Sequence, residues 1–559
     1  MRGQMIITSV FVWLAASGDG PAAAQQPAPD FVLTNGKIIT VDDRFTIAEA
    51  VAVLEERIAV VGTNEDIQAL AGPETTVIDL DGRSVIPGLI DNHAHIMEEG
   101  PIWQLELRLD GIATRAEALR LVAERATDLG PGKWVFTLGG WSIDQFTDDR
   151  SDFTRDELDE VAPDNPVLLQ VTREHTYLNS RAIEAAGLDQ MDAPWIVRDD
   201  AGRPTGVIDA EGIAIVAEAR PAPPSEIFES SSLAMIEDMN RAGLTTIGGP
   251  CPANYVNRFH RWGEEGRLNL RFFCFLPTAP SNAPEEVDAL LPQIAELKPF
   301  QMGNWVDLTA YGETVYRPLH DSMLAPTTNP AEEELYQWRR IATEIARAGL
   351  PLHVHATIEN TITRFLDQIE LVNREYPVRN LRWALAHVDQ VNASHLERMK
   401  NLGMYLAVHT RPTVMGGIYN RAHGDRSLDM PPLSLIQQSG IVWGLGTDAF
   451  EVNQYRPFTT LWWAVTGKMV GGTTVLRQTI SREDALIAYT RQNAFLVFQE
   501  NNLGSIQQGK LADLVVLDRD YLTIPAEEIK DIRPVMTMVG GRVAFDERQD
   551  VATNNGTPE

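Results

Sequence analysis

The sequence predicts an α/β protein built around a (β/α)8 barrel of the TIM type, with a small β-sandwich formed by both chain ends. Between about residues 87 and 496, short apolar runs typical of buried strands alternate with helical segments. About eight strand–helix units in succession favour a closed parallel barrel. Outside that range, both ends of the chain show the alternating pattern of half-exposed strands.

Five stretches indicate the sandwich. At the N-terminal end these are FVLTNGKIITVD, with an Asn-Gly hairpin signal, then AVAVLEERIAVVG and TTVIDLDGRSVIPG; near the C-terminal end they are GSIQQGKLADLVVLD and VMTMVGGRVAFD. We therefore assign residues 25–86 and 497–547 to the sandwich, 87–496 to the barrel and 548–559 to a tail. The long segment at about 97–215 is expected to be an insertion in the barrel.

Strand-like runs between residues 87 and 496 include KWVFTLGG, NPVLLQV, LTTIGG, LNLRFFCFL, NWVDLTAYG, LPLHVHA, LRWALAHV, MYLAVHT and IVWGLGTDA. Helical segments such as RAEALRLVAERATDL and AEEELYQWRRIATEIARAG separate them. In such barrels the chemistry lies at the C-terminal ends of the strands. Polar residues are therefore expected at the ends of these runs, and they are found there.

Composition narrows the class of partner. The chain has 559 residues, of which 44% are hydrophobic, and a formal net charge of −31. Nucleic acids and anionic membranes require a basic surface, so this charge argues against both. We expect a small-molecule substrate and no nucleic-acid partner, and the sequence is compatible with a homo-oligomer.

The N-terminus resembles a secretory signal peptide. Arg2 precedes the apolar run MIITSVFVWLAA, and an Ala-x-Ala site ends at Ala24. We expect cleavage near Ala24 (residues 1–24 removed) and export, in a bacterium to the periplasm. Because Cys251 and Cys274 lie far from that site, no lipid or other membrane anchor is expected. We expect both cysteines as buried free thiols, with one disulfide as the alternative in an oxidising compartment.

Five residues at strand ends predict a metal site. His93 and His95 are two residues apart, so on a strand both side chains point to the same face. His355, His387 and Asp448 each end a separate apolar run, and a barrel brings such ends together. Imidazole nitrogens and a carboxylate bind zinc or another divalent cation, and Asp448 is the expected catalytic residue because it can accept a proton from water.

The same motifs resemble the amidohydrolase superfamily of metal-dependent hydrolases. PGLIDNHAH, the later strand-end histidines, GTDA and GSIQQGKLADLVVLD carry this resemblance. GGWSIDQF, RDELDEVAPDNPVLLQVTREHTYLNSRAIEAAGL, GRPTGVID and ALIAYTRQNA are similar to the branch with N-substituted formamide deformylase and exoenzyme-regulatory proteins. The resemblance spans about residues 31 to 547. It implies a (β/α)8 barrel with a β-sandwich from both ends, and hydrolysis of a C–N or sometimes a C–O bond by a metal-activated water.

The chain departs from that branch at the residue that bridges two metals. The branch carries V-K-L-x-x-D-G with a lysine that can be carbamylated; here Asp307 replaces the lysine and Tyr311 the aspartate. Between His95 and His355 the lysines are Lys133 and Lys298, and neither is at an expected strand end. We favour one metal ion, bound by His93, His95, His355, His387 and Asp448. Two ions, with Glu313 or Asp307 replacing the lysine, are the alternative.

Further residues are candidates for contacts with the substrate. They are His175 after NPVLLQV, Trp141 after two glycines, Tyr311, and His409 at the end of MYLAVHT. His353 lies two residues before His355 and is expected to orient a ligand rather than bind metal. His260, His320, His395 and His423 fall in helical or loop contexts and receive no role.

The sequence therefore predicts an exported metal-dependent hydrolase that cleaves an amide-like C–N bond, not a peptide bond, in a small molecule. A lactone or ester hydrolase of the same fold is one alternative. The other alternative is a regulatory or binding protein that has kept the fold but does not catalyse a reaction. It is motivated by two absences: the bridging lysine, and the Glu-His pair that the branch commonly has before the fourth ligand.

Overall fold

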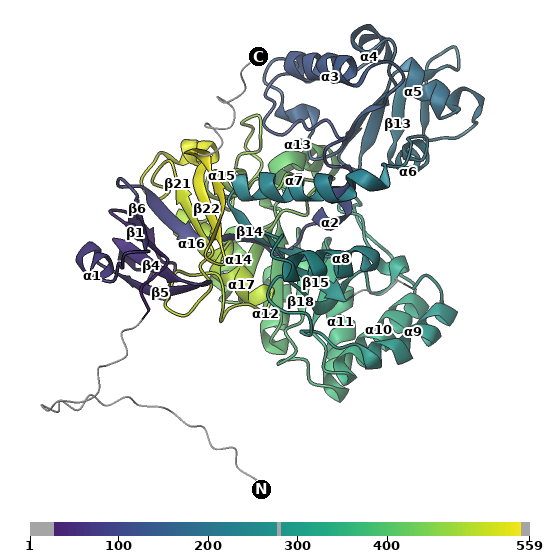
Figure 1. Ribbon diagram of the computed structural model, residues 1–559. Helices are drawn as coiled ribbons and strands as arrows, with labels where there is room; N and C mark the ends of the chain where they lie inside the picture. Colours follow the sequence, from purple (N-terminus) through teal and green to yellow (C-terminus); the bar gives the residue numbers. More distant parts are fainter. Residues whose placement is uncertain (1–26, 277–280, 549–559) are drawn as a thin grey trace, which may run out of the picture.

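A computed structural model describes residues 27–276 and 281–548 (Figure 1). The expected signal peptide at 1–24 lies outside the described residues, as does nearly all of the tail at 548–559. Within the described part, no helix combines the length and apolarity needed to cross a bilayer.

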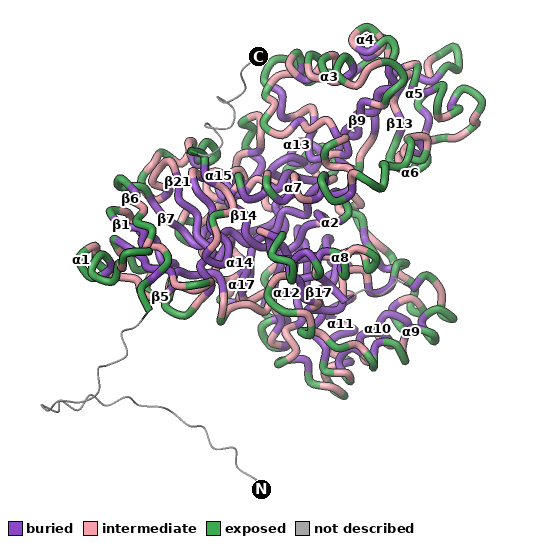
Figure 2. Tube along the Cα trace, in the orientation of Figure 1, coloured by how far each residue is buried: buried purple, intermediate pink, exposed green. Residues whose placement is uncertain are grey.

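The core of the molecule is an eight-stranded parallel barrel, as the sequence predicts. Its strands, in neighbouring order, are β8 (Leu89–Asp91), β14 (Leu244–Gly249), β15 (Arg271–Leu276), β16 (Val306–Glu313), β17 (Leu352–Ala356), β18 (Ala384–His387), β19 (Tyr405–His409) and β20 (Trp443–Gly446). Every residue of β8, β14, β15, β17, β18 and β20 is buried, as expected for parallel strands covered on both faces. Figure 2 shows this burial around β14 and β17.

Helices cover the outside of the barrel. They are α7 (Phe228–Arg241), α8 (Ala253–Glu264), α9 (Pro284–Glu296), α10 (Glu332–Arg347), α11 (Glu359–Glu375), α12 (Ala393–Leu402), α13 (Pro412–His423), α14 (Leu433–Ser439), α15 (Pro457–Thr466), α16 (Arg482–Ala488) and α17 (Arg491–Leu496). In α10, three glutamates in the first turn and Arg347 in the last complement the helix dipole. Its apolar residues recur every three or four positions and face the barrel: Leu335, Trp338, Ile341, Ala342 and Ile345.

The barrel closes between its first and last strands through one buried carboxylate. Asp91 Oδ1 accepts hydrogen bonds from the backbone N–H of His93 (3.1 Å) and of Thr447 (3.0 Å), and Asp91 Oδ2 accepts one from Thr447 Oγ1 (2.6 Å). Asn493 of α17 donates to the backbone oxygens of both Ile90 and Leu445. The segments that follow β8 and β20 are thereby held side by side.

The β-sandwich is built from both ends of the chain. One sheet has the order β5 (Arg57–Gly62), β4 (Ala50–Leu54), β1 (Phe31–Thr34), β6 (Thr76–Asp79). The other has β23 (Arg542–Asp546), β22 (Pro534–Val539), β21 (Leu514–Leu517), β7 (Ser84–Pro87), β2 (Lys37–Ile39), β3 (Ile47–Ala48). Leu33 and Val51 of the first sheet pack with Val85, Leu514 and Met538 of the second. The Asn35-Gly36 turn does not make the expected hairpin, because β1 and β2 belong to different sheets.

The part of the chain between β8 and α7 in the sequence forms an inserted unit, seen at the upper right of Figure 1. Its sheet has the order β12 (Ile196–Arg198), β13 (Pro204–Asp209), β11 (His175–Leu178), β10 (Val167–Val171), β9 (Val135–Leu138). Helices α3 (Arg115–Leu129), α4 (Arg155–Val161), α5 (Ser180–Ala185) and α6 (Ile213–Ala217) accompany it. The runs KWVFTLGG and NPVLLQV therefore form β9 and β10 of this unit, not barrel strands.

The inserted unit is attached to the mouth of the barrel. The backbone N–H of Gly140 donates to Glu451 O (2.7 Å), and Gln454 Nε2 donates to Gly140 O (2.8 Å). A Cβ on Gly139 would lie 2.1 Å from Glu451 O, so only glycine permits this approach. The loop after β20 is thus held directly against the insertion.

The expectation of two free thiols is wrong. Cys251 and Cys274 form a disulfide with Cα atoms 5.5 Å apart. The reason is the pairing of β14 with β15, which sets Gly249 opposite Cys274 and brings the residue two positions later within reach. Disulfides are typical of oxidising compartments, and export stays a prediction.

Replacing the closing carboxylate is expected to destabilise the fold. Asp91→Ala leaves the buried donors of His93 and Thr447 without an acceptor, so we expect about 3 kcal/mol of lost stability. Chemical denaturation followed by circular dichroism measures it, with exposed Asp128→Ala as the control. An Asp91→Ala midpoint equal to that of the control would contradict this account of closure.

Candidate metal centre

Six polar side chains from five barrel strands meet at the C-terminal mouth of the barrel. His93 and His95 follow β8, and Glu313 ends β16. His355 lies in β17, His387 ends β18 and Asp448 follows β20. The five residues predicted as ligands are therefore brought together, and Glu313 joins them.

Asp448 stands at the centre of one half of this cluster. Its Oδ1 lies 3.3 Å from His95 Nε2 and 3.6 Å from His93 Nε2. Its Oδ2 lies 3.6 Å from His387 Nδ1. The segments of His93 and Asp448 are joined directly, because the backbone N–H of Asp448 donates to His93 O (2.9 Å).

Glu313 connects this half of the cluster to a second half. Its Oε2 lies 2.8 Å from His93 Nε2 and 3.5 Å from His387 Nε2. Potential ligand atoms of Glu313, His320 and His355 also lie within 4.8 Å of one another. A carboxylate shared between two groups of imidazoles is placed to bind two ions or to bridge them.

The atoms at this cluster fit a divalent cation. Buried atoms without a hydrogen-bond partner in the described chain include His93 Nε2, Glu313 Oε2, His355 Nδ1 and both ring nitrogens of His387. His93 Nε2 and Glu313 Oε2 approach to 2.8 Å but lack hydrogen-bond geometry. Buried polar atoms left unpaired are costly, and nitrogen and carboxylate ligands of this kind bind zinc and similar metals.

Charges around Asp448 keep it ionised. Burial raises its pKa, but nearby His387, the hydrogen bond with His95 and the Arg411 guanidinium outweigh burial and hold the pKa well below its ordinary value. Arg411 is itself buried and donates to Asp389 Oδ2 (2.7 Å). The same oxygen also accepts a hydrogen bond from Tyr419 Oη (2.7 Å). Asp448 is therefore ionised at neutral pH.

Asp307 and Tyr311 do not belong to the centre. The Asp307 carboxylate accepts hydrogen bonds from the backbone N–H of Gln301 (3.0 Å), Met302 (3.1 Å) and Leu308 (2.8 Å). It is six residues before Glu313 on the same strand, roughly 20 Å at the rise of a β-strand. Tyr311 is fully buried in the main hydrophobic core. The expectation that Asp307 could replace the bridging lysine and the expectation that Tyr311 contacts the substrate are therefore wrong.

Trp141 also lies away from the cavity. It is fully buried in the core of the inserted unit, where it packs against Phe146 and Phe153 and donates from Nε1 to Thr137 Oγ1 (3.0 Å). The glycines before it serve the contact with Glu451 rather than the presentation of an aromatic ring. The expectation that Trp141 contacts substrate is wrong.

His175, His409 and His353 occupy three different positions. His175 is partly buried beside Tyr177 in the inserted unit and does not line the cavity at the centre. His409 is fully buried, with its ring 4.1 Å from that of His387, so it contacts the metal centre rather than the substrate space. His353 Nε2 lies 3.0 Å from His93 Nδ1, as suits a residue that orients a ligand.

Sequence reasoning missed four residues near the centre: Arg173, His320, Asp321 and Arg411. His320 and Asp321 lie in the loop after β16, and Arg411 follows β19 by two residues. Arg173 comes from the turn between β10 and β11 of the insertion and pairs with Glu451. Arg411 carried a usable signal, because it follows a strand-end histidine as Asp389 follows His387. The other three depend on loops whose course the pattern does not reveal.

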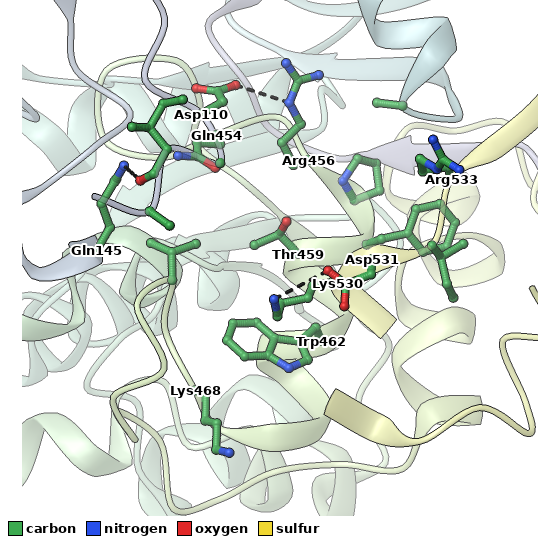
Figure 3. Close-up of a pocket in the computed structure, with 18 of the residues that line it drawn as sticks. Asp110, Gln145, Gln454, Arg456, Thr459, Trp462, Lys468, Lys530, Asp531 and Arg533 are labelled. Carbon is green, nitrogen blue, oxygen red and sulfur yellow. Dashed lines mark hydrogen bonds and ion pairs between the residues drawn. The ribbon is translucent and has the colours of Figure 1, made fainter. Parts of the chain in front are cut away.

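The centre opens into a cavity of about 270 Å³. Its polar lining includes His95, Glu98, Arg173, Glu313, His320, Asp321, His355, His387, Arg411, Asp448 and Glu451, and its apolar lining includes Met323, Leu324, Phe450 and Val452. A larger cavity of about 850 Å³ shares none of these residues (Figure 3). In the larger cavity, Arg456 pairs with Asp110 at 3.2 Å and Lys468 with Glu527 at 2.7 Å. No residue of the metal cluster lines it, so the centre opens into the smaller cavity.

A barrel with a cluster of imidazoles and carboxylates at its strand ends is typical of metal-dependent hydrolases. A family model described as "Amidohydrolase family" matches residues 76–545, and the chain belongs to that family. It is 26% identical to N-substituted formamide deformylase of Arthrobacter pascens, over 92% of this chain and 98% of that one. It is 24% identical to a putative amidohydrolase of Bacillus subtilis (91% and 98%). An uncharacterized metal-dependent hydrolase from Pyrococcus horikoshii shares the fold, with a TM-score of 0.64 and 21% sequence identity. The match covers 89% of this chain and 99% of that one.

Metal affinity is expected to rise with pH. Burial lowers the pKa of His95, but the hydrogen bond with Asp448 and the charges of Glu313 and Asp448 outweigh it and raise the pKa to about 9. Below that pH the metal-free protein holds a proton on His95 that a cation must displace. The apparent association constant for Zn²⁺ is therefore expected to rise up to about tenfold per unit from pH 6 to 8.

Calorimetry in buffers with different protonation enthalpies measures both the affinity and the proton released. Burial lowers the pKa of His355, but the hydrogen bond with Asp321 and its charge outweigh burial and raise it, so His355 adds to the release and at least one proton per chain is expected at pH 7. Affinity that is independent of pH, with no proton release, would contradict the placement of His95 as a ligand.

Proposed function

We propose that the protein is a metal-dependent amidohydrolase that cleaves an amide-like C–N bond, other than a peptide bond, in a small molecule. The observation that carries this proposal is the position of Asp448, within 3.6 Å of His93 and His387 and 3.3 Å of His95 at the edge of the cavity. A carboxylate so placed serves as ligand and as proton acceptor.

The residues of the chain divide the chemistry between them. A divalent cation bound there would polarise a carbonyl oxygen and lower the pKa of a water molecule. Asp448 accepts the proton of the attacking water and returns it to the departing nitrogen. Arg411, 3.6 Å from Asp448 Oδ2, holds that carboxylate in position and favours its charged form before the first transfer and after the second.

We further propose that the centre holds two cations that share Glu313. The preference for one ion drawn from the sequence assumed that a carboxylate is too short to replace a carbamylated lysine. Glu313, however, starts at the end of β16, six residues beyond Asp307, so its short side chain begins beside His93 and His387. One half of the centre would use His93, His95 and Asp448, and the other His355, with His387 between Asp448 and Glu313.

The substrate class rests on similarity and on the cavity. N-substituted formamide deformylase aligns over 98% of its own length, which supports an amide bond rather than a lactone. The cavity of about 270 Å³ is slightly below the size of drug-binding pockets, as suits a small acyl compound. Its apolar residues, Met323, Leu324, Phe450 and Val452, fit a hydrocarbon substituent on the nitrogen.

Removing the proton acceptor is expected to abolish hydrolysis. With a panel of N-substituted formamides, N-acyl amines and lactones, the wild-type protein should hydrolyse the amides and lose activity with a chelator. Asp448→Asn should lower kcat at least about 100-fold, whereas exposed Asp425→Asn should not change it. Preferential lactone hydrolysis would contradict the bond class, and full activity of Asp448→Asn would contradict the mechanism.

Glu313 is expected to determine the metal count. Plasma mass spectrometry of protein dialysed against Zn²⁺ and then metal-free buffer should find two ions per wild-type chain. In Glu313→Ala, which removes the shared oxygen ligand, we expect one or none. Two ions retained in this variant would show that Glu313 does not bridge them.

A further inference from the structure

The loop after β16 forms part of the wall of the cavity and reaches the metal centre. It contains a short 3-10 turn at Arg317–Leu319, and the following residues 320–324 all line the cavity. His423 Nε2 of α13 lies 2.8 Å from Met323 O, and Met323 and Leu324 pack against the apolar cluster of α13. The loop is therefore anchored on the side away from the barrel strands.

Asp321 of this loop binds one of the two ring nitrogens of His355. Its Oδ1 lies 2.8 Å from His355 Nε2, while its Oδ2 accepts from the backbone N–H groups of Thr357 (3.1 Å) and Ile358 (2.9 Å). With Nε2 held by a buried carboxylate, His355 Nδ1 remains buried and without a hydrogen-bond partner. A carboxylate that binds one imidazole nitrogen and leaves the other for a metal is a recurrent arrangement.

His320 lies against His355 on the cavity side. The two rings stack with centroids 3.7 Å apart at 25°. One ligand atom each of His320, His355 and Glu313 can be chosen so that all lie within 4.8 Å of one another. A divalent cation placed among these three atoms could bind all of them. Small side-chain adjustments would bring each atom to a zinc–ligand distance of about 2.0–2.2 Å.

We propose that His320 is a ligand of the second cation, together with Glu313 and His355, and that Asp321 positions His355 for it. This inference rests on the proposed two-cation centre. It assigns a ligand to a loop rather than to a strand end, so this loop would be held in place by the metal. The substrate would then enter beside a segment whose order depends on the second ion.

Metal content and spectra of Co²⁺-loaded protein test the proposal on the full chain. Wild type, His320→Ala and Asp321→Asn are compared with His423→Ala, which weakens the anchor of the same loop without removing a ligand. We expect two ions in wild type and His423→Ala, and one in His320→Ala, whose second ion free imidazole restores in part. Asp321→Asn should weaken binding of the second ion about 10–100-fold and alter its absorption bands.

Two ions bound by His320→Ala with unchanged affinity would overturn the role of His320 while leaving the proposed function intact. Equal loss of the second ion in His423→Ala and His320→Ala would show that loop order, not ligation, is responsible, and would also overturn it. A wild-type content of one ion would refute this inference and the shared role of Glu313. Amide hydrolysis by the same wild-type sample then reports separately on whether the proposed function stands.

Discussion

The constraint on which this structure depends is a set of buried acceptor atoms that the chain does not satisfy by itself. Glu313 and Asp448 share a buried space with His93, His95 and His387, and several of these ligand atoms have no hydrogen-bond partner in the described chain. Neutral imidazoles that face carboxylates in this way leave buried polar atoms unpaired, which is costly. A divalent cation bound among them would remove this cost, so we expect metal binding and the integrity of the site to be coupled.

The barrel makes this arrangement possible by closing at the right place. Asp91 and Asn493 hold the ends of β8 and β20 together, so the H-x-H motif lies beside Asp448 although more than 350 residues separate Asp91 from Thr447 along the chain. The loop after β20 then contacts the inserted unit through Gly140 and Gln454. The insertion thus shapes the cavity from outside, through Arg173 and its partner Glu451, without supplying a ligand.

Much of the fold and the strand-end part of the site was predictable, because both follow from local patterns. Alternating strands and helices indicated the barrel, and His93, His95, His355, His387 and Asp448 are positioned by strand ends. Loops and registers were not predictable. Asp307 was a candidate because it takes the place of the branch's lysine, although it lies six residues before Glu313 on β16. Trp141 was a candidate because a strand of the insertion resembles a barrel strand. His320 and Asp321 meet His355 only through the tertiary course of a loop, which leaves no periodic signal.

Anomalous diffraction from crystals grown with Zn²⁺ tests the central claim most directly, because it locates the ion without reference to activity. The account predicts two anomalous peaks, one within about 2.0–2.2 Å of His93, His95 and Asp448 and the other beside His355, with Glu313 at bonding distance of both. The same side chains in the same positions, with no anomalous peak among them after incubation with excess zinc, would contradict it.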